Sequence, residues 1–308
     1  MKLGELVPDP ARFSFSWPGP AEVRRIGESL ARFGQLRPLL CMEEGGALHL
    51  VAGHRRVRLL EELGTLEAAV RRVHARSREE LWDLLLEDHL DARPLNPVEL
   101  GLYARRRAAE TGESREELAR KVLPRLGLPP KASRLEDPLW LSGLPHEDRD
   151  AFAEGRLPAQ GARVLARADR DDALAILRLL RGASVGVNKF SELARWILEC
   201  AWAEGEPAEN WLAARGVGGA GQSVEALRAE VRRRRYPQLS AWESAFARDV
   251  GALSLPSGVR IAPPQGFEGG TLTCSVTFAS ADELGRALRA LLERLEAGEL
   301  AVLDRYLS

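Results

Sequence analysis

The sequence predicts an α+β protein made of three blocks. Strand-like and helix-like patterns alternate up to residue 95, whereas residues 96–205 show helical patterns alone. After a connection at 206–236, residues 237–308 return to a few strands and helices. We therefore expect a mixed domain at 1–95, an all-helical domain at 96–205, a linker with a basic helix at 206–236, and a small C-terminal domain at 237–308.

Composition narrows the function classes. The chain has 308 residues, 45% hydrophobic and 29% charged, as expected for a soluble protein of two or three domains. A net charge of -1 gives no general attraction to nucleic acid, so any DNA contact must come from local basic faces. Three widely spaced cysteines indicate buried thiols in a reducing cytoplasm. We expect no signal peptide and no membrane span.

The first block is predicted to hold a two-stranded hairpin between helices. Apolar residues at three- and four-residue steps predict a helix at 21–33 that ends at Gly34. Strands are expected at 39–42 and 48–51, joined at Gly45-Gly46, with another at 68–73. Ser77 and Glu80 form a capping-box pattern that opens a further helix.

Residues 53–58, Gly-His-Arg-Arg-Val-Arg, stand between the second hairpin strand and a predicted helix. Backbone donors at such a junction can hold a phosphate, and arginine adds charged donors. The alternative is that the arginine pair arises by composition, because the chain has 40 Arg against 4 Lys. Phosphate binding is the first functional hypothesis.

The helical block contains a modified helix-turn-helix pattern. Ser114 and Glu117 form a capping box that opens the first helix. Prolines and a glycine lengthen the turn, and the expected recognition helix begins near Lys131 and is interrupted early by Pro138. Lys131 and Arg134 are the candidate DNA contacts. The alternative is a packing helix that reads no sequence.

The last two segments combine a basic run with a small dimerisation pattern. Residues 206–222 are glycine-rich and predict a flexible connection, followed by a basic run that could bind DNA phosphates: Arg232, Arg233, Arg234 and Arg235. We expect a helix at 242–253, strands at 259–262 and 271–278, and a helix opened by Ser280 and Glu283. That helix carries a leucine row: Leu284, Leu288, Leu291, Leu292 and Leu295. So thin a core favours pairing with a second copy of the chain.

Over nearly its whole length the chain resembles the ParB family of partition proteins. Residues 53–56 match the family's Gly-Glu-Arg-Arg phosphate segment, and residues 88–92 align with its Glu-Asn-Leu-Gln-Arg motif. Leu95-Asn96-Pro97 and Glu99 then follow at the family's spacing. The resemblance implies a ParB/sulfiredoxin-like N-terminal domain, a helix-turn-helix block and a ββα-type C-terminal dimerisation piece.

The resemblance also implies a homodimeric clamp on double-stranded DNA that binds CTP with magnesium, works with a ParA-type ATPase and lies on the nucleoid. The implied nucleotide contacts are Arg37 for the base or ribose and Gly53, His54, Arg55, Arg56 and Arg93 for the phosphates. Asp88 and His89 are the implied metal ligands, and Asp88 is the candidate catalytic residue should the protein be a weak CTPase, with a side chain one carbon shorter than the family's Glu.

Departures from the family pattern keep other functions open. The family has Glu where this chain has His54, and Glu-Asn where it has Asp88-His89; imidazole suits magnesium poorly. The alternatives are a ParB-like transcriptional regulator without nucleotide control and a phosphotransferase with Asp88 or Glu87 as base. A sulfinic acid reductase is disfavoured because Ala52, not cysteine, precedes Gly53.

Overall fold

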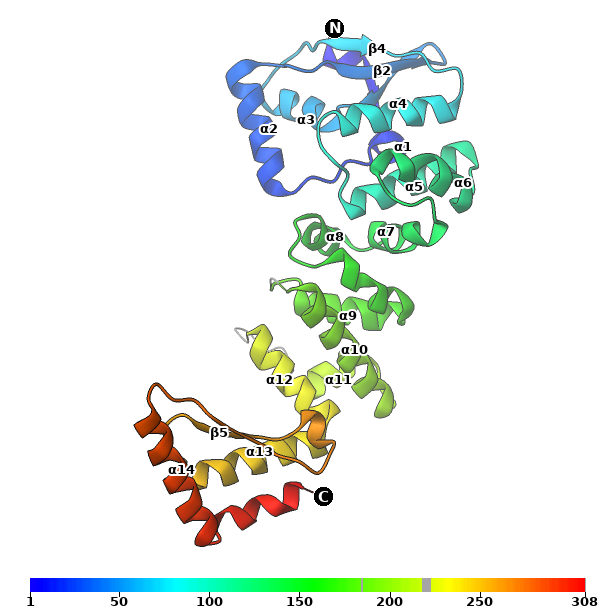
Figure 1. The fold of residues 1–308 in the computed structure, drawn as a ribbon. Coiled ribbons are helices and arrows are strands. Elements are labelled where there is room, and N and C mark those ends of the chain that lie inside the picture. Colours follow the sequence, from blue (N-terminus) through cyan, green and yellow to red (C-terminus); the bar gives the residue numbers. More distant parts are fainter. Residues whose placement is uncertain (184, 218–222, 308) are drawn as a thin grey trace. The chain divides into compact units, whose positions relative to one another are not determined.

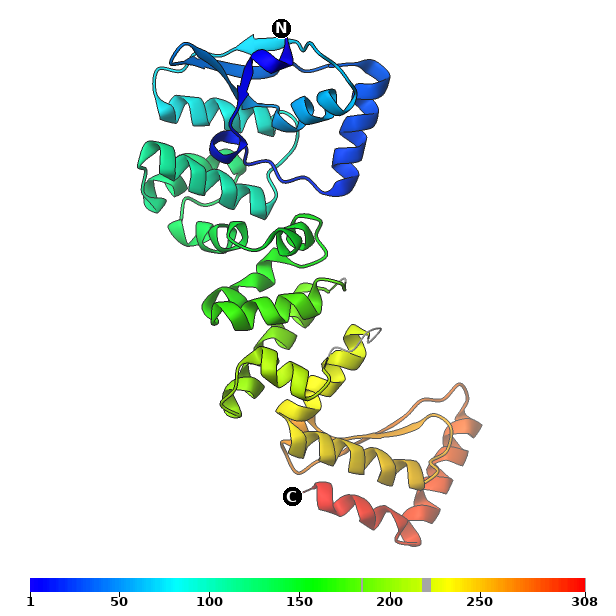
Figure 2. The same cartoon turned by 180° about the vertical axis from the view of Figure 1, so that it is seen from behind.

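The computed structural model describes residues 1–183, 185–217 and 223–307. The chain divides into two compact units, Met1–Arg215 and Gly216–Ser308, and each is described by itself. Figures 1 and 2 show the first unit with a sheet-containing end followed by stacked helices. The finer division of the first unit near residue 95 stays a prediction.

The N-terminal part is built on a four-stranded sheet of order β1-β3-β2-β4. Its strands are β1 (Leu6–Pro8), β2 (Leu39–Glu44), β3 (Ala47–Ala52) and β4 (Val70–Arg72). The predicted hairpin is confirmed, because β2 and β3 pair antiparallel around Gly45-Gly46, both of positive φ. β1 pairs parallel with β3, and β4 parallel with β2. The sequence patterns did not predict β1.

Helices cover this sheet and carry the residues of interest. They are the short turn η1 (Leu3–Glu5), α1 (Pro10–Phe13), α2 (Pro20–Phe33), α3 (His54–Glu62) and α4 (Arg78–Leu90). Both views place α3 and α4 against the same face of the sheet (Figures 1 and 2). The core between them contains Leu39, Cys41 and Leu50 from the hairpin, each 0% exposed, and Leu60 of α3. Because β3 ends at Ala52 and α3 packs on this core, the sheet fixes the position of the first turn of α3.

The rest of the first unit is helical, as predicted: no strand occurs in the described part of 96–215. The elements are α5 (Pro97–Thr111), α6 (Arg115–Val122), η2 (Leu123–Leu126), η3 (Ala132–Leu135), α7 (Glu136–Ser142), α8 (His146–Ala153), η4 (Ala159–Arg167), α9 (Arg170–Leu180), α10 (Val187–Ala203) and α11 (Ala208–Ala214). The expectation of a flexible connection from residue 206 was wrong for α11, because Ala208 and Trp211 are fully buried. Residues 218–222 of that connection lie outside the described residues.

Pro138 does not interrupt a helix, contrary to the sequence expectation. It lies in the first turn of α7, where the backbone N–H groups have no acceptor within the helix and proline costs little. Its carbonyl oxygen faces Gly101 of α5 at a helix crossing so close that a Cβ on Gly101 would stand 1.8 Å from that oxygen. The expected recognition helix is thus a 3-10 turn followed by α7.

Three helix starts were predicted from Ser-x-x-Glu patterns, and one is a complete capping box. The Ser114 side chain accepts from the Glu117 N–H, and Glu117 accepts from the Ser114 N–H. At Ser77 and Ser280 the serine caps as predicted. The glutamates there instead accept from the residue before the serine, Arg76 and Ala279. The helix start follows from the serine in each case.

We expect Ser114→Ala to lower the free energy of unfolding by about 1 kcal/mol, because the Glu117 N–H in the first turn of α6 loses its side-chain acceptor, while the backbone N–H of residue 114 keeps Glu117. Ser133→Ala is the matched control, since Ser133 is exposed on η3. Urea denaturation of both variants measures the difference. Equal stability of the two would contradict the capping role.

The described part of the second unit contains three α-helices and a two-stranded sheet. It comprises α12 (Val224–Arg235), α13 (Pro237–Ala252), β5 (Val259–Ala262), η5 (Gln265–Phe267), β6 (Thr273–Val276), α14 (Ala281–Glu296) and η6 (Glu299–Tyr306). The strands pair antiparallel. The core is small, as expected: its buried members are Phe246, Leu253, Leu303 and Tyr306. Three leucines of the predicted row on α14 are exposed, namely Leu288, Leu292 and Leu295.

The cysteine expectation holds for two of three residues. Cys41 and Cys200 are buried, but Cys274 is exposed, because β6 belongs to a sheet of only two strands and most of its residues face outward. Burial raises the pKa of the Cys41 thiol to about 11, so it is a poor source of thiolate. No helix in the described part of the chain is long and apolar enough to cross a membrane.

Candidate functional site: a pocket beside the hairpin

A pocket of about 970 Å³ lies in the first unit where the hairpin meets α2, α3 and α4. Its walls include both segments singled out from the sequence, Gly53–Arg56 and the end of α4 with Asp88, His89 and Arg93. The segment after β1, one side of α2 from Glu22 to Leu30 and the turn after α2 complete it. Segments more than thirty residues apart in the chain therefore share one cavity.

Gly53 is required by the backbone at this junction. It is the N-cap of α3 with φ of 99°, a left-handed conformation that residues with a side chain rarely adopt. A Cβ here would stand 2.8 Å from Cδ2 of Leu39 in β2. Because Gly53 lies at the pocket wall, the N–H groups of the first turn of α3, which have no acceptor within the helix, also lie there. Such free N–H groups favour the binding of a phosphate.

Arg55 and Arg56 line the pocket in different ways. Arg56 Nη1 donates to the carbonyl oxygens of Arg37 and Pro38, each at 2.9 Å, and so holds the turn before β2. Arg55 makes no hydrogen bond or ion pair with any residue in the described ranges, and burial lowers its pKa. A half-desolvated guanidinium with open donors is the stronger phosphate ligand of the two. Arg37 itself is exposed at the pocket rim.

Arg93 is already bound to carboxylates. Its Nη1 and Nη2 donate to both oxygens of Glu99 at 2.6 Å, and its Nε donates to Glu22 of α2 at 2.7 Å. Glu99 is 0% exposed at the start of α5 and also accepts from the Asn96 and Trp17 N–H groups. Arg93 thus ties α2 to α5 at the edge of the pocket. From the sequence, Glu99 was assigned to a motif but to no partner. The Asn-x-x-Glu pattern that it forms with Asn96 is typical of a capping box and could have predicted its bond to the Asn96 N–H.

Glu99 should make stability depend on pH. Burial would raise its pKa, but the hydrogen bonds from Arg93 and from the Asn96 N–H, with the His89 imidazole nearby, outweigh this and lower the pKa to about 2. A carboxylate with a depressed folded-state pKa stabilises fully above its unfolded pKa, near 4.5, and loses that contribution as pH falls towards 2.

We therefore expect Glu99→Gln to be clearly less stable than the parent at neutral pH and to approach it near about pH 3. Urea midpoints across this pH range check the expectation. Glu44 and Glu113, whose pKa values are also lowered to about 2, keep part of the acid sensitivity in both proteins. A constant difference between parent and variant at every pH would contradict the assignment.

The predicted metal ligands do not form a cage. No group of three or more His, Cys, Asp or Glu side chains in the described residues is placed to hold a metal ion. Asp88 lines the pocket near Arg56, but the Nε2 atom of His89 lies 3.6 Å from Glu99 Oε2. A magnesium ion would fit only with Asp88 and nucleotide phosphates as its oxygen ligands. His89 is oriented towards protein, not towards such an ion.

His54 has an unusual setting in the same wall. Its Nε2 atom is buried without a hydrogen-bond partner in the described structure. Burial, with help from nearby Arg106, lowers the pKa of His54 to about 4. The imidazole is therefore neutral near pH 7 and offers a phosphate no charge, unlike Arg55 beside it.

The side chains predicted to contact DNA differ in their exposure and in whether they already pair with other residues of the protein. Lys131 and Arg134 are exposed at η3. In the basic run, Arg233 is exposed, whereas Arg232 forms a bidentate pair with Glu243 at 2.5 and 2.7 Å. The remaining two members also have protein partners: Arg234 pairs with Glu230, and Arg235 lies 4.8 Å over the Tyr236 ring.

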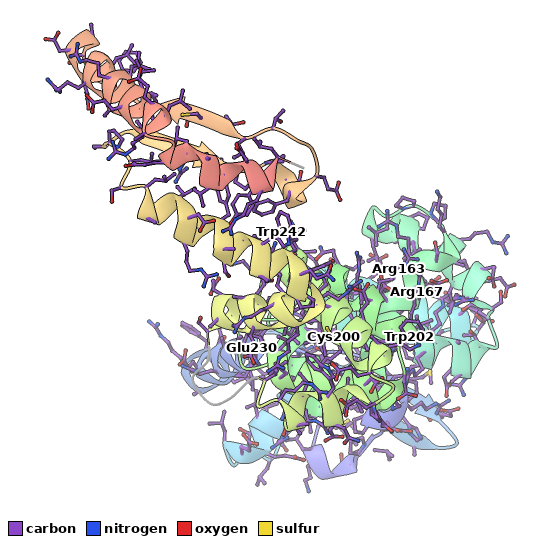
Figure 3. The ribbon with its side chains drawn as sticks, turned by 90° about the horizontal axis from the view of Figure 1, so that it is seen from below. Arg163, Arg167, Cys200, Trp202, Glu230 and Trp242 are labelled. Atoms are coloured by element: carbon purple, nitrogen blue, oxygen red, sulfur yellow. The ribbon has the colours of Figure 1, made fainter. Side chains whose placement is uncertain are left out.

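Two exposed arginines that the sequence reasoning passed over stand on η4. Arg163 and Arg167 lie near Asp137 in the first turn of α7, and Arg163 approaches Glu136 at 3.5 Å. Figure 3 shows their side chains close together on the helical block. Their spacing of four residues places them on one side of a helix and was visible in the sequence. Such pairs are common in a chain with 40 arginines, so this pair did not stand out. They add positive charge beside the acidic start of α7.

Comparison with known proteins identifies the relatives of the chain. No protein-family model matches it. A probable chromosome-partitioning protein ParB of Helicobacter pylori is 27% identical over 199 residues, which are 63% of this chain and 64% of that protein. The chromosome-partitioning protein Spo0J of Thermus thermophilus is 34% identical over 170 residues, 53% of this chain and 58% of that protein. The chain thus spans somewhat less than two thirds of these curated relatives.

The similar solved structures include two of C-terminally truncated Caulobacter crescentus ParB. The complex with the centromeric parS site has a TM-score of 0.35 and 20% identity, and covers 63% of this chain and 97% of that one. The complex with CTP-gamma-S has a TM-score of 0.26 and 20% identity, covering 58% and 96%. The curated relatives confirm the resemblance read from the motifs: this chain is a relative of the ParB and Spo0J chromosome-partitioning proteins.

Proposed function

We propose that the chain is a ParB-like DNA-binding protein of chromosome or plasmid partition, in which CTP acts as the switch of a dimeric DNA clamp. The observation that carries this proposal is the shared pocket of Gly53–Arg56 and the end of α4. Partition relatives support the DNA role. On this proposal the first unit combines a ParB/sulfiredoxin-like domain with a modified helix-turn-helix block, and the protein lies on the nucleoid and works with a ParA-type ATPase.

The pocket residues fit a nucleoside triphosphate. Arg55 offers uncommitted charged donors, Gly53 lets the ligand approach the backbone, and the first turn of α3 supplies N–H groups. The pocket volume of about 970 Å³ leaves room for a base and ribose near Arg37. Magnesium, when bound, would neutralise phosphate charge, with Asp88 as its protein ligand. Any hydrolysis would depend on Asp88 holding a water, with a side chain one carbon shorter than the family's glutamate.

DNA is proposed to contact the helical block at η3 and α7. Lys131 and Arg134 are exposed there, with Arg163 and Arg167 on the neighbouring η4. The basic run of α12 contributes chiefly through Arg233, since the other arginines have protein partners. Affinity carried by such phosphate contacts falls steeply as salt rises.

Fluorescence anisotropy of a labelled duplex with the full chain, with and without CTP and magnesium at low salt, tests the proposal. We expect the duplex to be bound and CTP to change that binding. Arg55→Ala should keep binding without nucleotide and lose the response to it. DNA binding identical with and without CTP in the parent would instead assign a regulator without nucleotide control. No DNA binding at low salt would refute the proposal.

The dimer is proposed to form through the second unit. Leu288, Leu292 and Leu295 are 51%, 52% and 60% exposed on one side of α14, beside a core of few residues. An apolar row of this kind on a small domain favours burial against a second copy.

We expect Leu292→Ser to shift the protein from dimer to monomer at micromolar concentration, because a leucine that loses its burial at an interface forfeits about 2 kcal/mol or more. Sedimentation velocity measures the shift. Glu293→Ser, at the adjacent exposed position of α14, is the control and should stay dimeric. A parent that sediments as a monomer would contradict the proposed dimer.

A further inference from the structure

Arg93 joins the pocket to two helices through ion pairs of unequal strength. Both Glu22 and Arg93 line the pocket, while Glu99 is fully buried behind them. Arg93 gives Glu99 two bonds of 2.6 Å and Glu22 one of 2.7 Å. The same guanidinium also donates to Pro94 O at 3.0 Å. Its donors are therefore shared between an inner and an outer carboxylate.

Of the two carboxylates, Glu22 is the one that a ligand of Arg93 can displace. Glu99 also accepts from two backbone N–H groups and is sealed from water, so removing Arg93 from it would leave a charge buried. The Glu22 side chain is 26% exposed and can be hydrated when released. A ligand that competes for Arg93 would thus displace Glu22 and leave Glu99 in place.

A triphosphate is such a competitor. It carries several negative charges and would lie beside Arg55, which has no hydrogen-bonded partner in the described residues. Glu22 interacts with Arg55 as well as with Arg93, so a phosphate bound there would repel the Glu22 carboxylate. Binding and release of Glu22 are then coupled by the same two arginines.

We propose that the Arg93–Glu22 ion pair is a nucleotide-operated latch on α2. Without nucleotide, Arg93 ties the first turn of α2 to the buried start of α5; a triphosphate takes over the outer donors of Arg93, and the first turn of α2 is released. This inference rests on the proposed nucleotide function and adds the element that responds to it. It gives the switch a direction: α2 loosens while α5 remains anchored through Glu99.

Two glutamine variants separate a latch from simple charge removal. Glu22→Gln removes the competitor for Arg93, so we expect CTP with magnesium to bind about fivefold tighter by calorimetry. Glu61→Gln is the matched control: Glu61 lines the same pocket, is exposed and has no ion pair with Arg93, so its effect should stay below about twofold. Equal gains in both variants, or no gain in Glu22→Gln, would overturn the latch.

Hydrogen exchange of the full chain supplies the second readout. In the parent, CTP should speed amide exchange in the first turns of α2 and leave the start of α5 protected. In Glu22→Gln those α2 amides should exchange fast even without CTP. Unchanged or slower α2 exchange on CTP binding by the parent would overturn the latch while leaving the nucleotide site intact. A parent that binds no CTP would refute the proposed function, and the latch with it.

Discussion

Gly101→Ala is expected to destabilise the first unit by more than about 3 kcal/mol, because the new methyl group would meet a backbone oxygen that cannot move away. The Cβ would stand 1.8 Å from the carbonyl oxygen of Pro138 and 2.9 Å from Cβ of Ser142, both in α7. Alanine would add about 1 kcal/mol of helix propensity, which is too little to offset separation of α5 from α7. The free energy of unfolding should therefore fall by a large amount.

Urea denaturation measures this loss, with Gly27→Ala as the control. Gly27 also lies inside a helix, α2, but its added Cβ would meet only Cδ2 of Leu59 at an ordinary 3.7 Å. The control should be neutral or stabilised by up to about 1 kcal/mol. Equal effects of the two substitutions would mean that α5 and α7 do not cross as described. The α5–α7 crossing matters for function because α7 is the proposed DNA-facing helix.

Arg55→Ala is expected to weaken CTP binding by about 10- to 100-fold, because a charged hydrogen bond to phosphate contributes about 1.5–3 kcal/mol. Its donors have no hydrogen-bond partner in the described residues, so the substitution breaks no hydrogen bond of the ligand-free fold. Calorimetric titration measures the affinity and thermal unfolding checks that the fold survives. Arg24→Ala, on the exposed side of α2 and outside the pocket, removes the same charge and should change affinity less than about twofold.

Arg56→Ala should differ in kind from Arg55→Ala. Arg56 holds the carbonyls of Arg37 and Pro38, so its loss frees the turn that carries Arg37 as well as removing a charge. The two adjacent arginines look alike in the sequence. Their division into a ligand-facing and a turn-holding residue depends on the fold of the hairpin, which no local pattern encodes.

Features set by local chemistry were predictable from the sequence. The hairpin at Gly45-Gly46 and the start of α6 at Ser114 follow from backbone conformation and capping within a few residues. The meeting of the Gly53 segment with the end of α4 was expected through the family resemblance, and the pocket brings them together.

Features set by distant contacts were not predictable. β1 is three residues long and exists through its parallel partner β3, some forty residues away. α11 stands in a glycine-rich neighbourhood that suggested a flexible connection, yet Trp211 is fully buried. The role of Glu99 depends on Arg93 and Trp17, which reach it from separate segments. In each case contacts with distant segments decide a feature that the local pattern leaves open or suggests otherwise.

Binding of a nucleoside triphosphate by the pocket through Arg55 can be measured by calorimetric titration of the full chain with the four ribonucleoside triphosphates and magnesium. We predict saturable binding of CTP with a Kd in the range of about 1–100 μM, clearly tighter than for the other three, and loss of that signal in Arg55→Ala. Absence of saturable heat with all four nucleotides would mean that the pocket is not a nucleotide site, and CTP binding that Arg55→Ala leaves unchanged would mean that Arg55 does not hold the phosphates.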